Sequence, residues 1–154
     1  MWTSEGHQKN HPIWVHNFDY TDKENIMSEQ HQFAHSRTLE ANWTPGLREM
    51  FDYRDLGVEA ATNGDYVAHI IRANWKKEPD AVQQWHVHHC TFQFVMVLNG
   101  WAEFEYEGHG VRKIEKGDVI YQRPGIRHRE IGCSEDFEVL EIVSPASFET
   151  EITE

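Results

Sequence analysis

Hydrophobic and polar residues alternate in short runs over most of this chain, and turn residues separate the runs. From Leu47 onward the runs are interrupted by Gly, Pro, Asn and Asp at intervals of about eight to twelve positions. No long stretch keeps the helical repeat that would predict an amphipathic helix. The pattern is therefore typical of an all-β sandwich or barrel. The predicted strands are Tyr66–Asn74, Gln84–His88, Thr91–Leu98, Trp101–Glu107, Val111–Glu115, Val119–Gln122, His128–Gly132 and Phe137–Val143.

The dipeptide Asn99-Gly100 lies between two of these predicted strands. Both residue types tolerate positive φ, which the tight turns of β-hairpins require. We therefore expect a hairpin at this point.

Residues 1–45 differ from the rest of the chain in their pattern of hydrophobic and polar residues. They are polar and show no sustained period of either strand or helix. We interpret them as an irregular N-terminal arm that packs on the barrel or on a partner subunit, with the barrel itself formed by residues 46–154. A further hypothesis is that translation begins at Met27, so that the first 26 residues would be a mis-assigned extension.

Charge and composition narrow the classes of function. The chain of 154 residues has a formal net charge of −12, which would repel nucleic acid and anionic membranes. Its N-terminus lacks the basic and apolar regions of a signal peptide, and its two cysteines form no disulfide framework. Its longest apolar stretch is too short to span a bilayer. We expect a cytoplasmic protein that binds neither nucleic acid nor membranes.

The candidate chemistry lies in the segment from Trp85 to Gln93. Residues i and i+2 of a strand project to the same face, so His86 and His88 point the same way. Two imidazoles on one face suit a divalent first-row metal. By the same alternation His89 should point away. Gln93 could add an amide oxygen from the next strand, and His128 follows a Pro-Gly turn later in the chain.

The order and spacing of these residues carry a family resemblance. After His86-x-His88 come four residues, Gln93, six residues and Gly100, then sixteen residues and the segment Gly117–His128. This resembles the two signature motifs of the cupin superfamily, over about residues 66 to 145. The resemblance implies a double-stranded β-helix, or jelly-roll, barrel. It also implies one divalent transition metal (Fe, Ni, Mn, Zn or Cu) held by His86, His88, Gln93 and His128.

The sequence departs from the family pattern at its first motif, where Gln93 replaces the usual glutamate. A neutral ligand leaves more charge on the ion, so we expect weaker metal affinity and stronger polarisation of bound oxygens. Alternatively, Gln93 only forms hydrogen bonds and three histidines bind the ion. Two smaller departures are Arg123, where the family often has proline, and Gly132, where it sometimes has asparagine.

Other residues near the motifs are candidates for catalysis. Tyr121 and Arg123 precede His128 and could orient a substrate, and Glu141 could be an acid or base in the pocket. Glu130 shares the predicted face of His128 and is a second candidate acid or base. Arg127 and Arg129 are more simply explained by surface ion pairs. Cys90 lies beside the site, but no neighbour in the sequence would activate it.

Three functions fit these predictions. The first is a metal-dependent oxidoreductase, similar to dioxygenases, that acts on a small organic molecule. The second is a non-redox isomerase or lyase that uses the same metal, and the third is a non-catalytic cupin that binds a small ligand or a metal. Three large apolar residues, Phe92, Phe94 and Met96, should face away from the metal and need a cover, which leads us to expect a homodimer.

Overall fold

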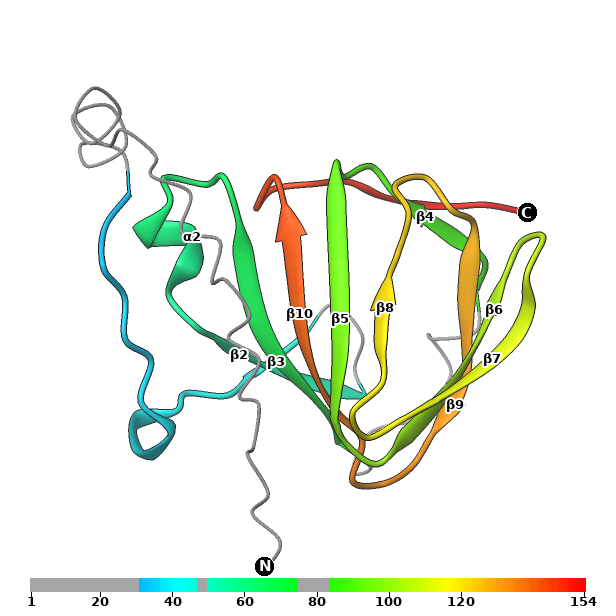
Figure 1. Cartoon of the computed structure of the whole chain (residues 1–154), viewed down its shortest axis with the longest axis horizontal. Coiled ribbons are helices and arrows are strands. Elements are labelled where there is room, and N and C mark those ends of the chain that lie inside the picture. The colour runs from blue at the N-terminus through cyan, green and yellow to red at the C-terminus, as the bar shows by residue number, and fades with distance from the viewer. Residues whose placement is uncertain (1–30, 47–49, 75–83) are drawn as a thin grey trace, which may run out of the picture.

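The computed structural model describes residues 31–46, 50–74 and 84–154, which form two antiparallel sheets closed into a barrel (Figure 1). The first sheet has the order β1 (Thr44–Pro45), β2 (Phe51–Asp55), β3 (Val67–Ala73), β10 (Glu138–Ser144), β5 (Phe92–Asn99) and β8 (Val119–Tyr121). The second has the order β11 (Thr150–Ile152), β4 (His86–His88), β9 (His128–Cys133), β6 (Trp101–Tyr106) and β7 (Gly110–Glu115). The prediction of an all-β jelly-roll barrel is confirmed. The hypothesis about Met27 lies outside the described residues.

The eight strands predicted from the sequence correspond to β3 through β10. Each end differs from the prediction by no more than two residues. The strands β1, β2 and β11 were not predicted. The first two add an edge to the first sheet, and β11 brings the C-terminal segment alongside β4 (Figure 1).

Alternating residues fill the space between the sheets. On β5, Gln93 and Val97 are buried, with exposed fractions of 3% and 1%. Opposite them on β10, Val143 is fully buried beside Gln93, and Val139 lies beside Val97. Valines of this kind have stiff side chains that pack well on a pleated surface. The apolar core therefore occupies one part of the barrel, and polar side chains from the same faces enter the remainder.

The turn at Asn99-Gly100 is not a hairpin, and that prediction was wrong. The strands on either side, β5 and β6, belong to different sheets. Of the two residues only Gly100 has positive φ, at 67°, and the Asn99 amide instead donates to the Asp136 carboxylate at 3.1 Å. The chain thus passes from one sheet to the other at a corner that is fastened to the loop before β10. Strand β6 instead forms a hairpin at its other end, where the turn through Gly108 joins it to β7.

Substituting Gly100 by alanine should destabilise the fold more than the same change at Gly108. Both glycines have positive φ, so the backbone strain is similar. A Cβ at Gly100 would lie 2.7 Å from Asp136 Oδ1 and 2.9 Å from the Phe137 Cα, whereas at Gly108 nothing lies within 4 Å. We expect Gly100→Ala to cost about 2–4 kcal/mol and Gly108→Ala about 1 kcal/mol. Urea unfolding of both variants measures this, and equal losses would contradict the steric explanation.

Hydrogen bonds connect the described part of the N-terminal arm to the rest of the chain, although residues 32–40 are all exposed. The Arg54 guanidinium donates to Ser36 Oγ at 2.9 Å, and the Gln32 amide donates to the Ala61 carbonyl at 2.7 Å. This segment contains a short 3₁₀ helix, η1 (Thr38–Glu40). The hydrogen bond from Gln32 joins it to the last residue of the four-residue helix α2 (Val58–Ala61). Neither helix of the described residues has the length or apolarity that a membrane span requires.

Candidate metal centre

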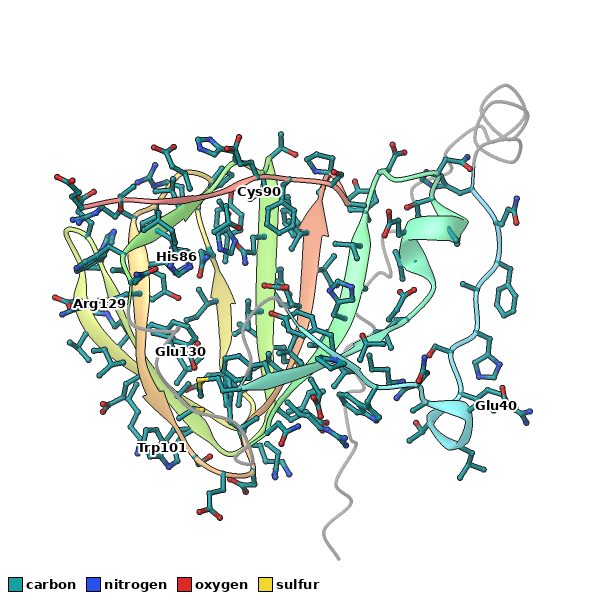
Figure 2. The ribbon with its side chains drawn as sticks, turned by 180° about the vertical axis from the view of Figure 1, so that it is seen from behind. Glu40, His86, Cys90, Trp101, Arg129 and Glu130 are labelled. Carbon is teal, nitrogen blue, oxygen red and sulfur yellow. The ribbon has the colours of Figure 1, made fainter. Side chains whose placement is uncertain are left out.

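A cavity of about 670 Å³ lies between the two sheets. Its volume is within the range of about 300–1,000 Å³ that is common for small-molecule sites. One part of the lining is polar and holds the histidines of the first and second motifs, and the rest is largely apolar. Figure 2 shows His86 and Glu130 on the second sheet, and both line this cavity.

Three histidines meet at the polar end of the cavity. His86 on β4 lies directly opposite His128 on β9, and His88 follows His86 on the same face. Their ring centroids are 4.2 to 5.1 Å apart. Their candidate ligand atoms all lie within 4.8 Å of one another, although residues 86 and 128 are far apart in the sequence. The structure therefore brings together the three imidazoles expected from the motifs.

Backbone carbonyls orient two of these rings. Nδ1 of His86 donates to the Gln84 carbonyl at 2.9 Å, and Nδ1 of His128 donates to the Ile126 carbonyl at the same distance. A proton held on Nδ1 leaves the lone pair on Nε2, the form in which imidazole binds a metal. His86 and His128 are only 2% and 3% exposed, so water competes weakly at these positions. The donor set and its tautomers fit a divalent transition ion.

Gln93 also lies at this end of the cavity, where it takes part in a chain of hydrogen bonds. Its Oε1 accepts from the Gln122 amide at 2.9 Å, and its own amide donates to Glu141 Oε1 at 2.8 Å. Since the oxygen already has a donor, this arrangement matches the alternative in which Gln93 positions its neighbours and three histidines supply the ligands. Ligation by Gln93 stays a prediction.

Gln122 is a member of the site that sequence reasoning missed. Its amide donates to Nε2 of His128 at 2.9 Å as well as to Gln93, and its Oε1 accepts from the Tyr106 hydroxyl at 3.1 Å. An ion bound to Nε2 of His128 would use the lone pair that now accepts the hydrogen bond from Gln122. Strand alternation could have identified this residue. Gln122 lies two positions after Ile120, so both side chains project to the same face, and that face lines the cavity.

The residues proposed for catalysis divide into two groups. Glu141 lines the cavity. Tyr121 is 59% exposed, with its ring tilted against that of Phe92 at 5.9 Å on the outside of the barrel, and Arg123 is exposed beside Pro124. A catalytic role for Tyr121 or Arg123 stays a prediction that this placement does not support.

The other candidates of the second motif have structural partners. Arg127 and Arg129 lie 4.5 and 4.9 Å from the ring of Trp85, and Arg129 pairs with Glu105 at 2.6 Å. His89 points outward, as expected, and contacts Glu151 at 2.8 Å. These residues hold β4, β9 and the C-terminal segment together outside the cavity.

The two cysteines are free and buried, and their environments disfavour thiolates. Burial raises the pKa of the Cys90 thiol, with Glu141 adding to the effect. Burial and the nearby Glu130 carboxyl, which is hydrogen-bonded to the thiol, raise the pKa of Cys133 to about 12. Neither thiol is therefore prepared to act as a nucleophile near neutral pH.

Replacing Gln93 by glutamate should strengthen metal retention and lower the stability of the metal-free protein. The new carboxylate would face Glu141 where the amide now donates, so two negative charges would meet without an ion between them. A bound cation would relieve that repulsion. We expect the melting temperature without metal to fall and the increase on adding metal to exceed that of the native chain. Calorimetry with and without added Zn²⁺ measures both, and unchanged metal retention would count against a place for Gln93 at the ion.

Comparisons with known proteins agree with this architecture. Residues 75–143 match the Cupin_2 family, described as a cupin domain. A search of functionally curated proteins finds no relative. Among solved structures, KdgF from Halomonas sp. is 21% identical with a TM-score of 0.58, over 73% of this chain and 94% of that chain.

Two further structures share the fold at lower identity. The polyketide cyclase RemF from Streptomyces resistomycificus is 12% identical with a TM-score of 0.63, over 80% of this chain and 87% of that chain. The Fe(II) form of HppE is 12% identical with a TM-score of 0.55, over 72% of this chain and 60% of that chain. At these identities the likeness shows the fold and not the activity.

Proposed function

We propose, from the match of residues 75–143 to the cupin family and from the cupin-like barrel, that this chain is a metal-dependent enzyme that acts on a small organic molecule. His86, His88 and His128 would hold the ion, because their ligand atoms converge and two of their rings are oriented by carbonyls. When bound, a divalent ion would polarise a substrate oxygen as a Lewis acid.

The observation that carries the proposal is the carboxylate of Glu141 beside this centre. Gln93 holds it through a hydrogen bond of 2.8 Å, and Gln122 in turn holds Gln93. Glu141 can then accept a proton from a carbon next to the polarised oxygen and return it elsewhere on the substrate. This chemistry is that of a non-redox isomerase or lyase, which we favour.

A dioxygenase is the second candidate. Three protein ligands leave coordination positions open for both a substrate and O₂, and the apolar lining of the cavity suits an aromatic or other hydrophobic substrate. This candidate needs a redox-active metal, whereas the isomerase or lyase does not. A non-catalytic binding protein would use the same site without turnover.

An activity screen with defined metals separates these functions. The full chain is purified without chelators, its metal content is measured, and samples loaded with Zn²⁺, Mn²⁺ or Fe²⁺ are tested against a library of small carbonyl and phenol compounds. Turnover with Zn²⁺ under anaerobic conditions supports the isomerase or lyase. O₂ uptake that occurs with Fe²⁺ and is absent with Zn²⁺ supports the dioxygenase. Ligand binding without turnover supports the binding protein, and failure to retain any transition metal refutes the proposal.

We also propose a cytoplasmic homodimer formed through the outside of β5 and β8. Phe92, Phe94 and Met96 alternate with the cavity-facing residues of β5, and Tyr121 lies opposite Phe94 on β8. Phe92 remains 36% exposed, so contact with a second copy would remove apolar surface from water and stabilise the pair. Light scattering on the native chain and on a variant with Phe92→Ser tests whether this surface holds two copies together.

A further inference from the structure

We infer that the cavity selects molecules whose body, away from the metal-binding oxygen, is apolar and neutral or cationic, and that it rejects anionic ones. The inference rests on the proposed function for the site and extends it to the substrate class. It depends on the charges that line the cavity.

Three carboxyl side chains contribute to the cavity lining, and the basic side chains among its described residues are all histidines. Glu59, Glu130 and Glu141 all contribute to the surface, and among the described lining residues there is no lysine or arginine. Glu130 is 2% exposed and lies two residues beyond His128 on the same face of β9. A negative charge on the body of a ligand would find no lysine or arginine among these lining residues to compensate it.

The arginines near the barrel are engaged outside the cavity. Arg127 and Arg129 stack on Trp85, Arg72 lies 3.8 Å from the ring of Trp43, and Arg54 donates to Ser36. None of them lines the cavity. Recognition of a carboxylate or phosphate normally uses such groups in direct, often bidentate, contact.

The remainder of the cavity is built for apolar contact. Phe51 and Phe137 meet edge to face at 6.5 Å between ring centroids, and Phe104 lies opposite Glu130 on β6. Ile71, Ile114 and Val139 complete this part of the lining. Because such surroundings solvate an isolated charge poorly, the penalty for a buried anion is larger here than in water. The metal can neutralise one donor oxygen, but it cannot serve a second negative group at the apolar end.

The test uses three catechols that differ in the charge on their side chain. Dihydrocaffeate carries a carboxylate, its methyl ester is neutral and dopamine is cationic, while an alkyl spacer separates these groups from the diol in each molecule. Binding of each to the full-length protein is measured by calorimetry, with and without Zn²⁺. We expect the ester and dopamine to bind at least about tenfold more tightly than dihydrocaffeate, because a single uncompensated charge in a low-dielectric site has at least this effect.

Variants connect the preference to the lining. Glu59→Gln, an exposed residue of the lining, should reduce the discrimination between ester and acid, whereas Glu135→Gln, in an exposed turn, should leave it unchanged. Equal or tighter binding of dihydrocaffeate, or no binding of the ester, would overturn the inference. Loss of metal retention would instead refute the proposed function, and the charge preference would still be read in the measurements without Zn²⁺.

Discussion

Replacing His128 by alanine is expected to reduce the affinity for divalent metal by more than about 100-fold, since changes to the outer partners of metal ligands alone cost 10- to 100-fold. His128 lies at the centre of the site. Its ring is 4.2 Å from that of His86 and 5.1 Å from that of His88, centroid to centroid. Its loss would leave two neutral ligands from one strand, which cannot enclose an ion.

Metal content after gel filtration and the shift in melting temperature on adding Zn²⁺ both report this loss. A ligand that binds only the folded state stabilises it, so the native chain should melt at a higher temperature with Zn²⁺ and the variant should not. His89→Ala is the matched control, because this ring is next to His88 in sequence but contacts Glu151 on the outside. If His128→Ala keeps its metal as well as the control does, the three-histidine site is wrong.

Alternation within strands made much of the fold predictable. A period of two in the sequence places His86 and His88 together and turns His89 away, and the structure has this arrangement. The same rule would have selected Gln122 over Tyr121 if the inward face of β8 had been known. The sequence shows that the two residues face opposite sides, but only a neighbour such as Val95, opposite Ile120, shows which side is inside.

Contacts between strands were harder to predict than the strands themselves. The bond between Gln93 and Glu141 depends on the register of β5 against β10, in which Gln93 lies opposite Val143 and therefore diagonally across from Glu141. No local pattern fixes that register. The pairing of β11 with β4 was missed for a related reason, because Thr150–Ile152 is short and exposed and has little pattern of its own.

Substituting Glu141 by glutamine should lower turnover by about 10²- to 10⁴-fold, the usual contribution of a positioned acid or base. The change removes the group that accepts the proton while keeping its shape and its oxygen, so the hydrogen bond from Gln93 can persist. Metal retention and melting temperature should stay close to those of the native chain. The effect should therefore appear in kcat and in the rate of deuterium uptake from heavy water into the substrate carbon.

Glu138→Gln is the matched control for this experiment. Glu138 lies on the same strand three residues earlier, opposite Arg72 on β3, and does not line the cavity. The same loss of one charge there should leave kcat unchanged, because the charge is outside the site. If Glu141→Gln also turns over at the native rate with its metal bound, proton transfer does not pass through this carboxylate. O₂ uptake with Fe²⁺ would then be the activity to measure, since the dioxygenase candidate requires the histidines but not Glu141.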